Sequence, residues 1–137
     1  MEERAAMLSK NPKAKLAKCV LLIGCRHPEK DALYMQELRD WEKVGAVELQ
    51  YAFSAAPARS HGCRYVQDRF WKSRGSHLSL ILHDGGKVLF CGGVRALEGV
   101  TESFIQAYAE QTGKSLEEGL AWFRAIRNQQ FVSAVFN

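Results

Sequence analysis

The clearest hydrophobic pattern is an uninterrupted apolar run at residues 20–23, which passes into Gly24, Cys25 and Arg26 and then into apolar positions at helical spacing. A strand without polar alternation should be covered on both faces, as strands of parallel sheets are. Strand, small-residue turn and helix make half of a nucleotide-binding βαβ unit. Open α/β sheets bind ligands at the carboxyl ends of their strands, so residues 24–26 are the predicted ligand end, with an anionic group as the expected ligand.

Apolar strand patterns alternate with helical patterns along the rest of the chain. The predicted strands are 19–24, 47–53, 87–91 and 131–136, and the predicted helices are 1–8, 30–44, 64–82, 97–111 and 115–128. Residues 57–62 are predicted to form a loop, and Ser115 with Glu118 has the spacing of a helix capping box. This alternation predicts an α/β fold with a parallel sheet. Trp41, Trp71 and Trp122 sit among apolar residues at helical spacing, which predicts core packing rather than a site.

Composition is that of an ordinary globular domain. The 137 residues are 47% hydrophobic and 25% charged, which allows one domain with a single core. The net charge is +4, but basic and acidic residues are interspersed except for four lysines between residues 10 and 18. We interpret that run as a solvated linker. No stripe of basic residues interleaved with aromatics is present in the sequence, so nucleic acid is not an expected partner.

The four cysteines, residues 19, 25, 63 and 91, form no Cys-x-x-Cys pair, and residues 1–18 do not resemble a signal peptide because they are charged throughout. A reducing cytoplasmic setting is therefore expected. No apolar run in the sequence approaches the roughly 20 residues that cross a bilayer, so no membrane span is expected.

Several segments together resemble a known family. They are residues 20–26, 47–54, 64–69, 87–93 and 122–137. In order and spacing they are similar to the NADPH-binding domain of the diflavin reductases, which include NADPH-dependent cytochrome reductases and fungal monooxygenase–reductase fusions. The resemblance covers roughly residues 15–137, and its likeness to the fungal fusions lies in residues 62–69 and 126–128. It implies a Rossmann-like parallel sheet of the ferredoxin-NADP reductase superfamily.

The same resemblance implies missing parts. The family's domain opens with a strand and a Gly-Thr-Gly phosphate loop, whereas residues 1–8 resemble the interior of the helix that follows them. We therefore expect residues 1–137 to form one truncated NADP(H)-binding-like domain, with residues 1–18 as a helix and basic linker. The flavin-binding domains are absent from the sequence, so no bound FAD or FMN is expected, and a flavoprotein partner would have to supply the flavin.

The lost strand would be central in the family's sheet, between the strands at 20–24 and 87–91. Its absence would leave two apolar edges unpaired, and such edges invite pairing. The two strands could close on one another, another chain could fill the gap, or the N-terminal segment could fold back. A homo-oligomer is the expected outcome.

The resemblance also assigns residues to the 2′-phosphate of NADPH. Ser54, Tyr65 and Gln67 match the family's residues, and Arg64 supplies the charge, while Cys25 and Arg26 lie in the predicted ligand turn. The family's second arginine is replaced by Ala55, unless Arg59 substitutes for it. Because an arginine contact to phosphate is bidentate and charge-assisted, NADPH binding is expected to be weak or lost. The alternative is that Tyr65 and Gln67 simply begin a helix.

Cys91 and Gly92 match the family's cysteine motif beside the transferring carbon of the nicotinamide, and Phe136 matches the aromatic residue that covers the flavin. No carboxylate accompanies Phe136, since the chain ends Ala134-Val135-Phe136-Asn137. The alternative for Cys91 is a buried cysteine at a strand end.

Two functional hypotheses follow. The first is a stand-alone NADP(H)-binding reductase-like module that supplies hydride to a flavin on a partner chain. The second is a repurposed remnant without redox chemistry, acting as an interaction protein or as a cofactor-independent enzyme in the old nicotinamide cleft. His27 or Glu29, near Cys25 and Arg26, is a weaker candidate for an acid/base pair, and no histidine or cysteine has metal-ligand spacing.

Overall fold

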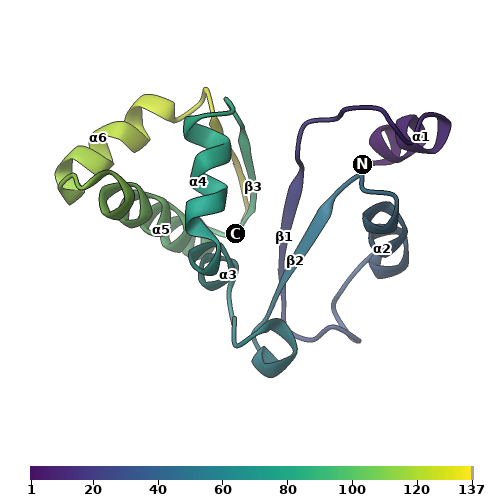
Figure 1. Ribbon diagram of the computed structural model, residues 1–137. Helices are drawn as coiled ribbons and strands as arrows, with labels where there is room; N and C mark the ends of the chain where they lie inside the picture. The colour runs from purple at the N-terminus through teal and green to yellow at the C-terminus, as the bar shows by residue number, and fades with distance from the viewer. Residues whose placement is uncertain (137) are drawn as a thin grey trace. The chain divides into compact units, whose positions relative to one another are not determined.

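The computed structural model describes residues 1–136, which form two compact units (Figure 1). The first unit is Met1–Arg69 and the second begins at Phe70, so that helix α3 (Val66–Lys72) crosses the boundary. Each unit contains a two-stranded parallel sheet. The chain is therefore a mixed α/β protein with parallel strand pairing, as the alternation of strand and helix patterns predicts, but the described strands form two small sheets rather than one.

The first unit is built on β1 (Val20–Cys25) and β2 (Glu48–Phe53), which are connected through α2 (Met35–Lys43). The strands pair in parallel along their whole length, so Cys25 lies opposite Phe53 and both strands end at the same edge. A helical crossover is what parallel strands require. The buried apolar residues of this unit are Leu38, Ala46, Val47, Ala52, Phe53 and Cys63.

The N-terminal helix α1 (Glu2–Lys10) ends before Pro12 and has no buried residue. It is attached to the unit through Arg4, whose Nε donates to the carbonyl oxygen of Ala46 at 2.9 Å and whose Nη2 donates to that of Ala17 at 2.6 Å. A single side chain thus ties the helix both to the start of β2 and to the lysine-bearing segment that precedes β1.

The predicted helix at 30–44 is too long at its start, because α2 begins only at Met35. The preceding residues turn instead: the amides of Lys30 and Asp31 donate to the carbonyl oxygen of His27, and Tyr34 adopts a left-handed backbone with φ of 56°. Leu33 and Tyr34 are exposed rather than packed on the helix face.

The second unit contains α4 (Arg74–Leu82), β3 (Val88–Gly92), α5 (Val94–Thr112), α6 (Leu116–Ile126) and β4 (Phe131–Val135). Strands β3 and β4 pair in parallel, and α5 packs along α6. Four phenylalanines fill the core. Phe104 stacks on Phe70 with ring centroids 4.2 Å apart, and Phe131 meets both Phe104 and Phe123 edge-on.

The close packing of α5 against α6 depends on a glycine. A Cβ at Gly119 would lie 3.0 Å from the carbonyl oxygen of Ile105 and 3.2 Å from its Cγ2. The predicted capping box at the start of α6 is confirmed: the Glu118 amide donates to the Ser115 hydroxyl, and the Ser115 amide donates to the Glu118 carboxylate.

Three further predictions need correction. The helix predicted over 64–82 is broken at Ser73 into α3 and α4, and the loop at 57–62 contains a short 3-10 helix, η1 (Pro57–Ser60). The tryptophans are half-buried rather than central, and Trp122 stacks on Tyr108 with ring centroids 4.2 Å apart. No helix within residues 1–136 is long and apolar enough to span a membrane.

Candidate functional site

The carboxyl ends of β1 and β2 bring three of the predicted site residues together in the first unit. Past the last paired residues, the amide of Ser54 donates to the carbonyl oxygen of Cys25 at 3.0 Å, and the amide of Ala55 donates to that of Arg26 at 2.9 Å. The two turns therefore leave the sheet side by side. This is the edge at which open parallel sheets place ligands.

The loop that follows β2 is anchored by Ser60, which the sequence did not single out. Its hydroxyl is 3.0 Å from the amide of Phe53, from which it accepts, and 2.7 Å from the carbonyl oxygen of Cys63, to which it donates. Ser60 is 2% exposed. A buried serine that satisfies backbone groups on both sides of a loop fixes the path of the residues between them.

Arg64 and Tyr65 lie at the entrance to α3, where Asp68 holds the backbone. The carboxylate oxygen Oδ2 of Asp68 accepts from the amides of Arg64 and Tyr65 at 3.0 and 2.9 Å. An aspartate three residues after the start is a helix-capping pattern that is visible in the sequence, although we did not identify it there. A Cβ at Gly24 would lie 3.0 Å from Cγ1 of Val66, so the absent side chain at Gly24 lets α3 begin close to β1.

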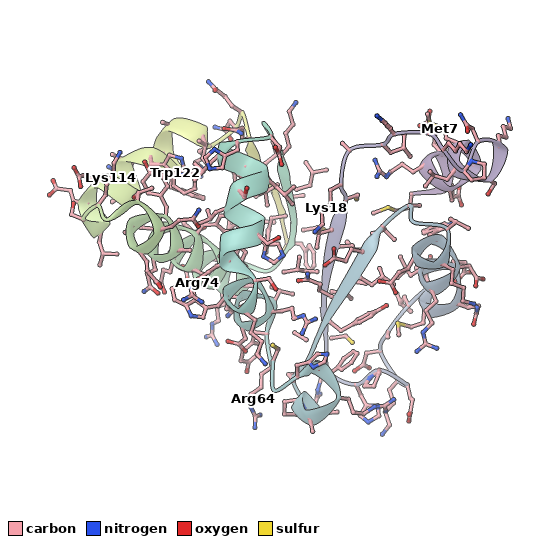
Figure 2. All side chains as sticks on the ribbon, in the orientation of Figure 1. Met7, Lys18, Arg64, Arg74, Lys114 and Trp122 are labelled. Carbon is pink, nitrogen blue, oxygen red and sulfur yellow. The ribbon has the colours of Figure 1, made fainter. Side chains whose placement is uncertain are left out.

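Arg64 reaches back toward β2. Its Nη1 donates to the carbonyl oxygen of Ser54 at 3.4 Å, a long contact, and the side chain is exposed (Figure 2). Tyr65 is 55% exposed, whereas Gln67 is half-buried. The structure therefore brings the predicted residues Ser54 and Arg64 together. Tyr65 directly precedes α3 and Gln67 lies in its first turn, and the alternative that the two residues only begin a helix stays a prediction.

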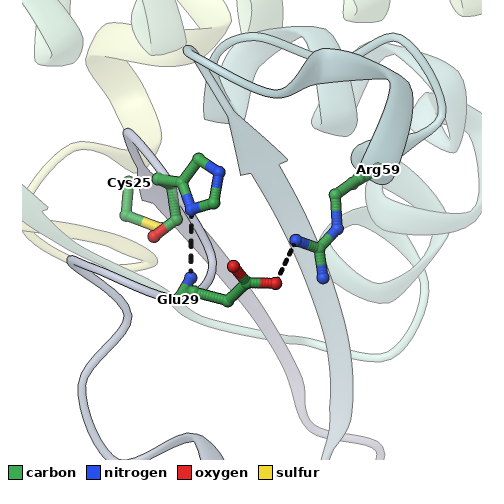
Figure 3. Close-up of polar contacts among 4 residues, drawn as sticks. Cys25, Glu29 and Arg59 are labelled. Atoms are coloured by element: carbon green, nitrogen blue, oxygen red, sulfur yellow. Dashed lines mark hydrogen bonds and ion pairs between the residues drawn. The ribbon is translucent and has the colours of Figure 1, made fainter.

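A second arginine at the same edge is already paired. Nη1 of Arg59 lies 2.7 Å from Oε1 of Glu29, and this contact joins η1 to the turn after β1 (Figure 3). The hydrogen bond from Arg59 holds the pKa of the Glu29 carboxyl below its usual value. At the same turn, His27 Nδ1 accepts the Glu29 backbone amide while the Glu29 carboxylate binds Arg59.

Cys25 is a weak nucleophile in these surroundings. Burial and the nearby Asp31 carboxylate raise the pKa of its thiol, and its Sγ donates to the carbonyl oxygen of His27 at 3.9 Å. A thiol with a raised pKa stays protonated at neutral pH. Cys25 therefore contributes backbone and shape to this edge rather than a thiolate.

The remaining predicted residues belong to the second unit. Cys91 lies on β3 opposite Ala134 and is exposed, so the alternative of a buried strand-end cysteine is wrong. The amide of Phe136 donates to the carbonyl oxygen of Gly92 at 3.1 Å, and the Phe136 side chain is 62% exposed. Asn137, the last residue of the terminus compared with the family, lies outside the described residues.

The second unit also has a shallow hollow of about 330 Å³ between α5, the end of α6 and β4. Its lining includes Glu98, Glu102, Arg127 and Phe131, none of which is a predicted site residue. Within residues 1–136, no three histidine, cysteine or acidic side chains gather in a way that could hold a metal ion.

Comparison with known proteins identifies relatives along the whole chain. A bifunctional cytochrome P450/NADPH–P450 reductase of Fusarium oxysporum is 39% identical over 142 aligned positions, and one of Acremonium egyptiacum is 35% identical over 137; they cover 100% and 99% of this chain. A self-sufficient cytochrome P450 monooxygenase of Phanerodontia chrysosporium is 38% identical over 99% of the chain. The chain spans only 13% of the length of each of these relatives.

These relatives confirm the resemblance to reductase fusions, and the hypothesis of a repurposed remnant finds no support among them. The family model described as "Oxidoreductase NAD-binding domain" matches residues 4–103, which include β1, β2 and β3. That match covers most of the chain. The protein therefore belongs to the oxidoreductase NAD-binding domain family.

Proposed function

We propose that this chain is an NADP(H)-binding reductase-like module with a Rossmann-like fold, and that it presents the dinucleotide to a flavin held on a flavoprotein partner. The observation that carries the proposal is the meeting of Ser54 and Arg64 at the carboxyl end of β2, beside the turn of Cys25 and Arg26. A hydroxyl, an exposed guanidinium and adjacent backbone amides are suitable donors for a phosphate.

The residues of the first unit fit the adenosine 2′-phosphate. Within residues 1–136, the guanidinium of Arg64 makes only a long hydrogen bond to Ser54, and the side chain is exposed, so it can turn to an anion without breaking a buried contact. Tyr65 offers an exposed aromatic ring at the entrance to α3. In the second unit, the exposed thiol of Cys91 has the accessibility that a residue beside the nicotinamide needs. When bound, NADPH supplies a hydride.

Binding should be weak. Ala55 contributes no guanidinium where the family has an arginine, and each lost contact to a charged group is worth about 1.5–3 kcal/mol. We therefore expect a dissociation constant for NADPH of roughly tens of micromolar or weaker. No FAD or FMN should accompany the purified chain, and the homo-oligomer expected from the sequence remains a prediction.

The deciding experiment is a calorimetric titration of the 137-residue chain with NADPH and with NADH. Saturable binding of NADPH that is tighter than binding of NADH supports the proposal. Addition of NADPH-loaded chain to an oxidised flavoprotein should then bleach the flavin absorbance. Absence of saturable binding of either dinucleotide at millimolar concentration would exclude this function.

A further inference from the structure

The Glu29–Arg59 ion pair occupies the edge of the sheet where the proposed dinucleotide site lies. Glu29 is four residues past the end of β1, and Arg59 is six residues past the end of β2. The two strands end opposite one another, so both turns begin at the same edge. The 2.7 Å contact between Nη1 and Oε1 spans the two turns (Figure 3).

Hydrogen bonds fix the backbone next to each residue of the ion pair. On the Glu29 side, the amide of His27 donates to the Asp31 carboxylate and the amide of Glu29 donates to His27. On the other side, the residue after Arg59 is the buried anchor Ser60. The ion pair is therefore a feature of two fixed turns.

The two side chains remain open to a ligand. Side-chain exposure is 52% for Arg59 and 69% for Glu29. A pair that is so solvated is weakly held, and a dianionic phosphate can compete for its arginine. The Arg59 contact keeps the pKa of Glu29 low, so at neutral pH the competitor for Arg59 is a full negative charge.

The ion pair contains the two residue types by which dinucleotide-binding folds distinguish NADH from NADPH. In dinucleotide-binding α/β folds an acidic residue accepts the ribose 2′-hydroxyl of NADH, whereas a nearby arginine accommodates the 2′-phosphate of NADPH. This edge has one residue of each kind, and they are bound to one another. The carboxylate both engages the arginine and repels a phosphate.

We propose that Glu29 is a specificity-determining residue, which narrows the preference for NADPH over NADH by holding Arg59 and by repelling the 2′-phosphate. This inference rests on the proposed dinucleotide-binding function. It assigns Arg59 as a second phosphate-binding guanidinium whose availability is set by Glu29. Arg64, whose guanidinium donates to the backbone carbonyl of Ser54, does not depend on Glu29.

The test uses titrations of NADPH and NADH on the wild-type chain, Glu29→Gln, Arg59→Ala and the double variant. Glu29→Gln should strengthen NADPH binding by about 3- to 5-fold, the upper scale of one exposed charge contact, and leave NADH binding within about 2-fold. Arg59→Ala should weaken NADPH binding by a similar factor. Without Arg59, the gain from Glu29→Gln should shrink to about 2-fold or less, because only direct repulsion remains.

Glu110→Gln is the matched control. It breaks the exposed Arg74–Glu110 pair, whose Nη2 and Oε1 are 2.9 Å apart, and it changes the net charge by the same amount. This control should leave both affinities unchanged. The inference is overturned if Glu29→Gln leaves the ratio of NADPH to NADH affinity at its wild-type value, if Glu110→Gln shifts that ratio equally, or if the gain persists fully without Arg59.

Arg64→Ala separates the two possible failures. If Arg64→Ala weakens NADPH binding while Glu29→Gln does nothing, the dinucleotide function stands and the role of Glu29 is wrong. If neither the wild-type chain nor any variant binds NADPH, both the function and the role of Glu29 are excluded.

Discussion

Nη1 of Arg64 donates to the carbonyl oxygen of Ser54, ten positions earlier in the chain, at 3.4 Å. The contact links the start of α3 to the end of β2 within the first unit. Since the carbonyl is a neutral acceptor and the distance is long, the hydrogen bond is weak and easily exchanged for a phosphate oxygen. Arg64 is thus held near the predicted phosphate position, and its guanidinium remains available to bind a phosphate.

Arg64→Ala should therefore weaken NADPH binding by about 10-fold, the lower end for a charged hydrogen bond at an exposed site, and leave NADH binding nearly unchanged. Titration calorimetry with both dinucleotides measures the effect. Arg124→Ala, which removes an exposed arginine from α6 in the second unit, is the control and should change neither affinity. Equal losses for NADPH and NADH would show that Arg64 does not meet the 2′-phosphate.

Ser60→Ala should destabilise the first unit by about 1–2 kcal/mol, because it removes a buried acceptor for the Phe53 amide and a donor for the Cys63 carbonyl. Urea unfolding followed by tryptophan fluorescence and circular dichroism measures the change. Selectivity for NADPH should fall as well, since the freed loop carries Arg59. Ser76→Ala, an exposed position in α4, is the control. A stable variant with unaltered selectivity would contradict the anchoring role.

Cys91→Ala should spare NADPH binding and slow hydride transfer to an added flavoprotein by roughly 10-fold or more, equivalent to ~1.4 kcal/mol of barrier. The thiol is exposed on β3 and has no part in the core, so the substitution should not disturb folding. Stopped-flow absorbance of the flavin measures the rate. Cys19→Ala is the matched control, because it removes a thiol outside the predicted site, and it should leave the rate unchanged. An unchanged rate would remove Cys91 from the reaction.

Gly119→Ala should destabilise the second unit by about 1–3 kcal/mol, since the added methyl meets the backbone carbonyl of Ile105 as well as its Cγ2, and the helical carbonyl cannot move aside by a rotamer change. Gly75→Ala is the counterpart on α4, where nothing lies within 4 Å of the added Cβ. It should be neutral or stabilise by up to about 0.5 kcal/mol through helix propensity. Thermal unfolding of the pair compares them, and equal melting temperatures would contradict the packing argument.

Local sequence patterns anticipated the parts of the fold that depend on local chemistry. The apolar run of β1 and the capping box of Ser115 follow from hydrophobic periodicity and from cap spacing. Helix α2 was misplaced because Leu33 and Tyr34 fit its period, whereas the turn at His27 and the left-handed Tyr34 delay its start.

The tertiary contacts of the site were harder to foresee. Glu29 and Arg59 are 30 residues apart, and a single pair of opposite charges has no periodicity to reveal it. Ser60 is likewise one serine among polar loop residues, and only its burial under the loop marks it as an anchor. The family resemblance identified Ser54 and Arg64, but it could not identify which cation at this edge is already paired with a carboxylate.

Ser115→Ala should destabilise α6 by about 1 kcal/mol, the usual cost of losing a serine N-cap. The hydrogen bond from the Ser115 backbone amide lowers the pKa of Glu118. The ionised form of this carboxyl is therefore favoured more in the folded state than in the unfolded state. A lowered pKa gives stability that is present above the unfolded pKa, about 4.3 for glutamate, and is lost as the pH falls through the folded value. Urea midpoints should therefore fall on acidification in the wild type and fall less in Glu118→Gln, with Glu117→Gln, which does not join the capping box, as the control. Identical acid dependence of the wild-type and Glu118→Gln midpoints would show that the ionised capping box does not contribute to folding.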